Sequence, residues 1–276
     1  MTSYTLIDGN NYLRRLYEKD RDISGLRASV LDVRSEIARP NNQVVFFWDG
    51  FNANDWRKAI YPNYKSNRSN SQIDQNDFFE QINIFRKIVE NLSIPYFRVD
   101  GYEADDLIAA FALALPTGTK IHIKSTDKDF EQIVGATHEG RTIEDTLKDE
   151  IEKERVKGKS VEGLDWVITS DLVVPFKTMV GDTSDSIKGI PGFGKKRWLL
   201  SDKQPIKDWF ARDFAGPFPE MSDTLANWCA NNLDELRAMR DACLFRPIDK
   251  DFLASNMKRG VDNPAAVEQI LKDNLA

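Results

Sequence analysis

Nine acidic residues occur in five short clusters, each of which follows an apolar run or opens a helical one. They are Asp8 in LIDGNN, Asp49 in VVFFWDG, Glu103, Asp105 and Asp106 in GYEADDLIAAF, Asp127 and Asp129 in IHIKSTDKDF, and Asp182 and Asp185 in MVGDTSDSIKG. A single carboxylate at the end of a strand normally lies in water and carries no chemistry. Five such clusters in one chain indicate a shared pocket of oxygen ligands, which suits hard divalent cations.

Each cluster taken alone also has a structural explanation. Asp8 and Asp49 each precede glycine and would suit turns, as would the Asp-x-Asp pattern of STDKD. Glu103 and Asp106 would share a face in the first turn of a helix, where acids oppose the helix dipole. Like charges this close are unfavourable unless a cation or a proton compensates them. Taken together, the clusters predict a two-metal site for phosphodiester hydrolysis, in which one ion activates water and the other stabilises the leaving oxygen.

The elements that must position these acids alternate between strand and helix. The sequence predicts strands at 4–7, 43–48, IPYFRV and KIHIKS, helices at about 24–38, 74–91 and from near Glu103, and a turn leading into helix at DKDFEQIV. Such alternation predicts an α/β fold with a parallel central sheet flanked by helices. Ligands of these sheets bind at the carboxyl ends of the strands, where the acids fall.

The later part of the chain has a different character. Residues 141–160 are heavily charged and predict a surface helix or excursion without a function of its own. From Asp171 the pattern is helical, with Pro175 suited to a helix first turn and GIPGFG at 189–194 as a sharp connection. We therefore expect a metal-binding α/β core at 1–170 and a helical part at 171–276.

Composition excludes several classes of function. The 276 residues are 41% hydrophobic, which is enough for a real core, and no apolar run approaches the length of a membrane span. Two cysteines and two histidines are too few and too scattered for a zinc site, a disulfide framework or a catalytic Cys or His. Without a signal pattern at the N-terminus, we expect a cytoplasmic protein.

The net charge of −6 would by itself argue against nucleic acid as a partner. Neutralising the nine clustered acids with metal, however, leaves a net positive remainder, and two stretches without acids concentrate it. The first interleaves Trp56, Tyr61 and Tyr64 with Arg57, Lys58, Lys65 and Arg68. Aromatic rings that stack bases and cations that meet phosphates suit single-stranded nucleic acid, although a solvated amphipathic helix interrupted at Pro62 would give the same pattern.

The second stretch, Ser186 to Arg197 within DSIKGIPGFGKKRW, contains Lys188, Lys195, Lys196 and Arg197 around a glycine-rich turn. Glycines let the backbone approach a phosphate closely, and amides at a helix start offer donors to an anion. A simple helix connection would explain the glycines equally well. Because the stretch follows Asp182 and Asp185 within a few residues, we favour binding to the backbone of a duplex.

These motifs, in this order over about residues 4–200, resemble the 5′ nuclease superfamily of flap endonucleases and 5′-3′ exonucleases. The similarity is greatest to stand-alone bacteriophage enzymes and to the 5′ nuclease domain of bacterial DNA polymerase I. The matching segments are IDGNN, FFWDG, WRKAIYPNYKSNR, GYEADD, STDKDF and GDTSDSIKGIPGFGKKR. The resemblance implies a PIN-like 5′ nuclease fold with a helical arch at about 52–80 and a helix-hairpin-helix motif at about 175–205.

The resemblance also implies roles for individual residues. Asp8, Asp49, Glu103 and Asp105 would hold a first metal and Asp127, Asp129, Asp182 and Asp185 a second, with Asp106 between the groups. Lys65 and Arg68 would lie near the scissile phosphate, with Arg57 at the base of the arch. DNA contacts would come from Tyr12, Arg15, Tyr64, Lys188, Gly189, Gly192, Gly194, Lys195 and Lys196. The ions would be two Mg²⁺, for which Mn²⁺ could substitute, and the helix-hairpin-helix turn would bind K⁺.

The expected function is a structure-specific 5′ nuclease of phage-type DNA replication or repair. Its partners would be DNA with 5′ ends, flaps or nicks, with RNA–DNA hybrids as a further candidate substrate. We expect a monomer in the cytoplasm of a bacterial host, working with a separate polymerase or single-strand-binding protein. Two alternatives stay open: a PIN-type ribonuclease with a similar acidic pocket, and a junction-binding protein without catalysis.

Overall fold

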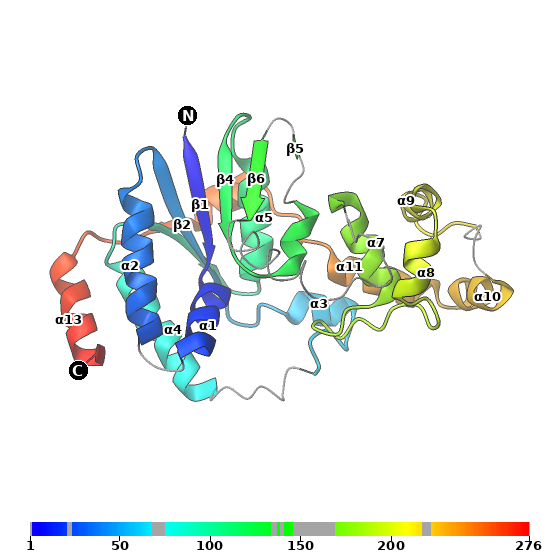
Figure 1. The fold of residues 1–276 in the computed structure, drawn as a ribbon, viewed down its shortest axis with the longest axis horizontal. Coiled ribbons are helices and arrows are strands. Elements are labelled where there is room, and N and C mark those ends of the chain that lie inside the picture. Colours follow the sequence, from blue (N-terminus) through cyan, green and yellow to red (C-terminus); the bar gives the residue numbers. More distant parts are fainter. Residues whose placement is uncertain are drawn as a thin grey trace. The chain divides into compact units, whose positions relative to one another are not determined.

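The computed structural model describes residues 2–20, 24–67, 75–133, 137–138, 141–145, 169–216 and 222–275. By its internal contacts the chain divides into two units. The first comprises Met1–Ala53, Ser71–Lys157 and Arg246–Ala276, and the second Asn54–Asn70 and Gly158–Phe245. Figure 1 shows the elements of both, and each unit is described by itself below. Among the described residues, no helix has the length and apolar character that crossing a membrane requires.

The first unit is built on one sheet with the strand order β5-β6-β4-β1-β2-β3-β7. Its strands are β1 (Ser3–Asp8), β2 (Asn42–Asp49), β3 (Pro95–Val99), β4 (Lys120–Lys124), β5 (Thr137–His138), β6 (Arg141–Asp145) and β7 (Lys258–Arg259). The five central strands from β6 to β3 are parallel, and the two-residue strands at the edges are antiparallel. The predicted α/β fold with a parallel central sheet is confirmed.

Helices cover both faces of this sheet (Figure 1). One face is buried against α1 (Gly9–Asp20), α2 (Ser24–Ala38) and α4 (Gln75–Glu90), and its strands contribute Ile7, Val44, Phe46 and Trp48 to a core that includes Phe85. The opposite face carries Phe47 and Phe97, whose rings stack with centroids 5.1 Å apart and meet Phe111 of α5 (Ala104–Ala114) edge-on. Burial on both faces explains why the strands are nearly continuous apolar runs.

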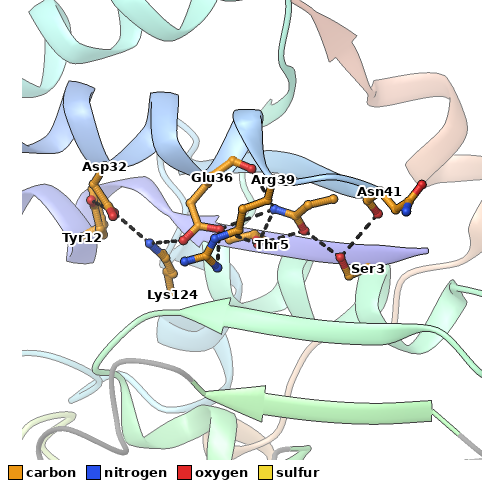
Figure 2. A network of polar contacts seen from close by, with 9 residues as sticks. Ser3, Thr5, Tyr12, Asp32, Glu36, Arg39, Asn41 and Lys124 are labelled. Atoms are coloured by element: carbon orange, nitrogen blue, oxygen red, sulfur yellow. Dashed lines mark hydrogen bonds and ion pairs between the residues drawn. The ribbon is translucent and has the colours of Figure 1, made fainter. Parts of the chain in front are cut away.

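A partly buried polar network ties β4 to the helices α1 and α2 (Figure 2). The Lys124 ammonium lies 2.7 Å from a carboxylate oxygen of Asp32 and 2.7 Å from one of Glu36, which is itself 1% exposed. The Tyr12 hydroxyl donates to the same oxygen of Asp32, and the Thr5 hydroxyl lies within hydrogen-bond distance of Glu36. Paired and hydrogen-bonded in this way, the charges meet the requirement for burial, and they fix the end of β4 that leads into STDKD.

The end of the chain returns to the first unit, which the predicted boundary at residue 170 did not anticipate. Helix α12 (Lys250–Asn256) packs on α5, β7 pairs with β3, and α13 (Pro264–Leu275) lies beside α4 (Figure 1). In the other direction, residues 54–70 of the predicted core belong to the second unit. The composition of a segment indicates whether it is helical or extended, but not which unit it packs against. Whether a segment pairs with the edge of a sheet depends on tertiary contacts that the local sequence does not show.

The second unit is helical. It contains α3 (Asp55–Ile60), α7 (Ser170–Val180), α8 (Lys195–Leu200), α9 (Lys203–Ala211), α10 (Asp223–Asn231) and α11 (Leu233–Cys243). Its core includes Met179, Phe193, Trp198 and Trp209, together with Tyr64 from the short segment that joins it from the first half of the chain. The helical character predicted beyond Asp171 is therefore correct for this part of the chain.

Three local predictions need correction. Arg141–Asp145 form strand β6, parallel to β4, rather than the start of a charged helix, because the edge of β4 offers backbone groups that a neighbouring strand can pair. The rest of the charged segment 140–165 lies outside the described residues. Pro175 is the sixth residue of α7 and not in its first turn, so it supplies no amide hydrogen to the carbonyl of Asp171. DKDFEQIV forms only a short 3-10 helix, Lys128–Gln132.

Candidate metal centre and nucleic-acid segments

Three neighbouring parallel strands carry acids at or beyond the same edge of the sheet. β4, β1 and β2 are adjacent in the sheet. Asp8 is the last residue of β1, Asp49 is the last residue of β2, and Asp127 follows the end of β4 by three residues. The register aligns Ile7 with Lys124, which brings the residues after β4 level with Asp8. Sheet topology therefore brings together three clusters that are far apart in the sequence, as predicted from strand ends.

Asp49 is exposed and is held at both carboxylate oxygens. The Asn10 side-chain amide donates to Oδ2 at 2.7 Å, and the backbone N–H of Ala104 donates to Oδ1 at 2.8 Å. Because Ala104 is the first residue of α5, this bond joins the end of β2 to the helix that carries the third acidic cluster. A carboxylate fixed in this way is oriented before any cation arrives, which lowers the ordering cost of binding one.

Asp8 is buried and surrounded by other acids. Burial raises the pKa of its carboxyl well above the usual value, and Asp49 raises it further, with additional contributions from Asp127 and Asp105. The hydrogen bond from the Asn11 backbone N–H, 3.1 Å long, opposes this shift. Four carboxyl groups of the first unit are thus close enough to repel one another, and a divalent cation would relieve that repulsion.

The loop after β4 is fastened to Asp8 and α1 by neutral polar groups. The Ser125 hydroxyl donates to Asp8 Oδ2 at 3.1 Å and accepts the backbone N–H of Asp127 at 3.2 Å. Asn11 Oδ1 accepts both the backbone N–H and the hydroxyl of Thr126, at 2.9 and 3.0 Å. Asp127 in turn caps the 3-10 helix by accepting the N–H of Asp129 at 2.9 Å. These contacts hold two predicted metal ligands in a fixed relation to a third.

Glu103, Asp105 and Asp106 form a second grouping at the start of α5, where one carboxylate oxygen from each lies within 4.8 Å of the others. All three are buried. Asp106 is fully buried, and its Oδ1 accepts the backbone N–H of Arg246 at 2.8 Å. One oxygen of Asp106 is therefore engaged in fixing the returning end of the chain, which makes this residue a structural anchor as well as a predicted ligand.

Asp182 and Asp185 belong to the second unit, where Lys177 lies between them. The Lys177 ammonium is 2.7 Å from Asp182 Oδ2 and 3.9 Å from Asp185 Oδ2. Burial would raise the pKa of Asp182, but Lys177 and the hydrogen bonds from Ser184 outweigh it and hold the pKa at about 2. Lys177 thus serves as a counterion for both acids. The predicted second metal site combines Asp182 and Asp185 with acids of the first unit, and it stays a prediction.

The basic segment around Lys65 docks on the loop that carries this acid pair. The Lys65 backbone N–H donates to the carbonyl of Asp185 at 3.0 Å, and Asn67 Nδ2 donates to the carbonyl of Thr183 at 2.6 Å. Lys65 is half-buried, has a positive φ of 53°, and places its ammonium 4.8 Å from the centre of the Tyr64 ring. Arg68 lies outside the described residues, so its predicted role stays a prediction.

Arg57 has a structural role that the sequence did not reveal. It is 2% exposed, and its guanidinium donates to the carbonyls of Ala242 and Leu244 at 3.2 and 3.1 Å. These carbonyls lie at the end of α11, where the last turn of a helix lacks partners of its own. Arg57 therefore caps a helix of the second unit, and a place beside the substrate remains a prediction from the sequence.

The residues predicted to contact DNA fall into a buried and an exposed group. Tyr12 and Tyr64 are each 1% exposed and belong to the cores of their units, so stacking on a base would require either ring to leave its core. Arg15 is half-buried on α1. By contrast, Lys188, Lys195, Lys196, Gly192 and Gly194 are all exposed on the segment between α7 and α8 or at the start of α8.

Four polar residues of the site were not predicted: Asn10, Asn11, Ser125 and Lys177. The first three lie within three residues of an acid in DGNN and STDKD, and that proximity is a signal that the sequence does offer. Lys177 offers none, because it precedes Asp182 by five residues inside an apolar helix. A buried counterion is recognised only once the helix and the following loop are seen together.

These observations define the class of protein: an α/β fold with a parallel central sheet whose carboxyl edge brings together carboxylates that could ligate a metal ion. The chain belongs to the 5′-3′ exonuclease family, because the sequence model of the 5′-3′ exonuclease N-terminal resolvase-like domain matches residues 3–161.

Similar proteins include a 5′-3′ exonuclease of Mycoplasmopsis pulmonis (strain UAB CTIP) and a DNA polymerase I of Rhizobium leguminosarum. The first is 28% identical over 204 residues, covering 70% of this chain and 63% of the relative. The second is 31% identical over 162 residues, covering 57% of this chain and 14% of the relative. The flap endonuclease Xni of Shewanella woodyi (strain ATCC 51908 / MS32) is 26% identical over 204 residues, covering 71% and 75%. The chain thus spans less than two thirds of the length of the first two.

Solved structures support the fold. The T5 5′-exonuclease, in a structure described as having divalent metal ions (zinc) bound, has a TM-score of 0.60 at 17% identity, with 99% of this chain and 98% of that one covered. The catalytic core of Rad2 in complex with DNA substrate has a TM-score of 0.53 at 15% identity, with 99% and 86% covered. The predicted 5′ nuclease fold is confirmed, whereas the helix-hairpin-helix motif stays a prediction.

Proposed function

We propose that this protein is a divalent-metal-dependent 5′ nuclease that hydrolyses DNA phosphodiesters near a junction of duplex and single strand. The observation that carries the proposal is the convergence of Asp49, Asp105 and Asp127 on Asp8 in the first unit; burial and then these neighbours raise the pKa of Asp8. Membership of the 5′-3′ exonuclease family supports it. The all-oxygen donor set and the mutual repulsion of its members fit hard cations.

Mg²⁺ is the proposed cation, with Mn²⁺ able to replace it, since both accept carboxylate and water oxygens. Two such ions would supply an activated water and stabilisation of the leaving oxygen. The protein's own contribution is orientation: Asn10 and Ala104 hold Asp49, and Asn11 and Ser125 hold Asp8. No protein nucleophile is then required.

The second unit would supply contacts to the substrate. We propose that Lys65 neutralises charge at the scissile phosphate, together with Arg68, and that Asp182 and Asp185 serve the second ion. Lys188, Lys195 and Lys196 are exposed and carry no acid between them, which suits the phosphates of a duplex. Binding of K⁺ by the turn at 189–194, cleavage of RNA–DNA hybrids, a monomeric state and a cytoplasmic location are further parts of the proposal.

The test is digestion of 5′-labelled flap, nicked and blunt duplexes in Mg²⁺, in Mn²⁺ and in EDTA. We expect short 5′ products that require the metal. The matched variant is Asp49→Asn, whose exposed side chain can still accept the Ala104 N–H. It should bind the same DNA in Ca²⁺ and cleave at least about 100-fold more slowly, because one metal ligand and its charge are lost.

The two alternatives give different results in the same assay. Cleavage of single-stranded RNA with no preference for a junction would favour a PIN-type ribonuclease. Tight binding of junction DNA without metal-dependent cleavage would favour a junction-binding protein. Wild-type rates in Asp49→Asn would contradict the metal centre itself.

A further inference from the structure

Phe51 is the most exposed large apolar side chain among the described residues of the first unit, with 69% of its surface in solvent. It follows Asp49, an exposed carboxylate of the candidate metal centre, by two residues. Single exposed apolar residues are common and need no explanation by themselves. The setting of this one differs, because its backbone is held rigidly beside a carboxylate cluster.

The backbone on either side of Phe51 is paired with the loop that follows β3. The Phe51 N–H donates to Asp100 Oδ1 at 3.0 Å, and the Phe51 carbonyl accepts the N–H of Gly101 at 2.7 Å. One residue earlier, the Gly50 N–H donates to the carbonyl of Tyr102 at 3.0 Å. Three hydrogen bonds over two residues leave this turn little freedom to move.

The backbone at Gly50 lies against the backbone at the end of β3, with no room for a side chain between them. A Cβ atom placed on Gly50 would lie 1.9 Å from the carbonyl oxygen of Val99, so only glycine fits there. The turn from Asp49 to Phe51 is therefore fixed on one side by β2 and on the other by the residues that lead into α5. An aromatic ring carried by such a turn is preorganised, and little of its binding energy is lost in ordering the chain.

We propose that Phe51 stacks on a nucleobase of the substrate next to the phosphate held at the Asp49 end of the metal centre. The ring offers a flat apolar face and no charge, so it suits a base and not a phosphate. It makes no ring contact with the described aromatic residues, and 69% of the side chain is open to solvent, so the ring has surface to offer to a base. This assignment deepens the proposed nuclease function and rests on it.

The first measurement is binding of a 5′-flap duplex in Ca²⁺, followed by single-turnover cleavage in Mg²⁺. Phe51→Ala should weaken binding or slow cleavage about tenfold, the effect expected for the loss of one stacked base. Phe51→Trp should restore it, because stacking does not depend on the identity of the ring. Leu113→Ala is the control: Leu113 is 39% exposed on the same unit, but lies nine residues along α5 from Ala104, roughly 14 Å away.

The second measurement separates stacking from a general effect on the loop. Abasic sites are placed one at a time in the nucleotides around the cleavage point, and each substrate is tested with wild type and Phe51→Ala. At one position the wild-type protein should lose about the same factor of ten, and the variant should lose nothing further. Such non-additivity identifies the base that Phe51 contacts.

Two results would overturn the inference. One is a Phe51→Ala protein that matches wild type on the intact substrate, and the other is a penalty of equal size on every abasic substrate. Both leave the proposed function untouched, provided that wild type cleaves in Mg²⁺. If wild type shows no metal-dependent cleavage at all, the proposed function fails first and independently.

Discussion

At the scale of single residues, the candidate metal centre is a balance between repulsion and orientation. Asp8 lies among three other carboxyl groups, and neutral groups from Asn11 and Ser125 hold it there. Repulsion between the carboxylates destabilises the metal-free folded state, and a bound cation would relieve this repulsion. It should therefore affect stability and metal affinity in opposite directions, and both can be measured.

Asp8→Asn should stabilise the metal-free protein at neutral pH while abolishing cleavage. Because the pKa of Asp8 is raised above 3.8 in the folded protein, the folded state binds more protons than the unfolded state between the two values. Stability must then fall as pH rises from about 4 through the folded pKa. The asparagine side chain in the variant cannot ionise, so the variant does not lose this stability as pH rises. Its melting temperature in EDTA should therefore exceed that of wild type by a margin that grows with pH.

The control for this experiment is the same comparison with Mg²⁺ added. Wild type should gain melting temperature on adding the metal, and Asp8→Asn should gain less because it has lost a ligand. A variant that is less stable than wild type in EDTA at every pH would show that hydrogen bonds to Asp8, and not repulsion, dominate at this position.

Ser125→Ala should raise the Mg²⁺ concentration needed for half-maximal cleavage by about tenfold. The hydroxyl is fully buried and bridges Asp8 Oδ2 and the backbone N–H of Asp127, and partners of metal ligands typically contribute this much to metal affinity. Cleavage rate as a function of Mg²⁺ is the measurement. Thr119→Ala is the matched control, since it removes a buried hydroxyl, bonded to the Pro116 carbonyl at 2.7 Å, at the opposite end of β4. An equal Mg²⁺ requirement in both variants would remove Ser125 from the positioning of the site.

The acids of the first unit could be predicted from the sequence because carboxylates at strand ends are unusual in number and chemically specific. Asn10, Asn11 and Ser125 lie within three residues of an acid, but neutral polar residues are common in turns, and that proximity alone does not assign them a role before their partners are seen. Burial was equally invisible: Arg57 and Tyr64 look exposed in a basic, polar segment, yet both are core residues of the second unit.

At the scale of elements, the segment between α7 and α8 shows that its glycines serve different purposes. Gly189 has a φ of +73°, and a Cβ there would lie 2.6 Å from the backbone of Gly181 and Val180. Gly194 has an ordinary φ of −86° and nothing within 4 Å of where its Cβ would be. The first glycine is required by the fold, whereas the second leaves an open backbone surface that a phosphate could approach.

The two glycines therefore give a matched pair of variants. Gly189→Ala should lower the free energy of unfolding by about 1–3 kcal/mol, because it combines a clash with a strained backbone. Gly194→Ala should fold with nearly wild-type stability and bind duplex DNA more weakly, since its methyl group would obstruct the predicted phosphate contact. Urea unfolding and fluorescence anisotropy with a duplex measure the two effects. Full duplex affinity in a folded Gly194→Ala protein would contradict the predicted contact.

Elements with strong periodicity were predicted close to their observed bounds, as for β1, β2, α2 and α4. The strands that were not predicted have a common cause: each forms only because a neighbouring strand is there to pair with it. β6 and β7 exist because the edges of β4 and β3 have backbone groups to pair. Helix α1 was not predicted because its polar first residues resemble a turn. At its start the Asn10 side chain donates to Asp49 and the Asn11 backbone N–H donates to Asp8.

At the scale of the whole molecule, the chain does not complete one unit before beginning the other. It leaves the first unit after Ala53, returns at Ser71, leaves again after Lys157 and returns at Arg246. The acids follow the same division, with seven in the first unit and Asp182 and Asp185 in the second. The basic segment at Lys65 belongs to the second unit together with Asp182 and Asp185. The order of the motifs along the sequence does not suggest this grouping.

The return of the chain at Arg246 has a practical consequence for dissecting this protein by expression of fragments. A fragment ending at residue 245 would keep the whole second unit and all nine predicted metal ligands, yet it would remove β7 from the edge of β3 and α13 from beside α4. It would also remove the backbone amide that Asp106 accepts. Loss of activity on trimming this tail would thus report damage to the α/β unit. A protein fused after residue 276 would be attached to that unit, not to the helical unit that precedes it in the sequence.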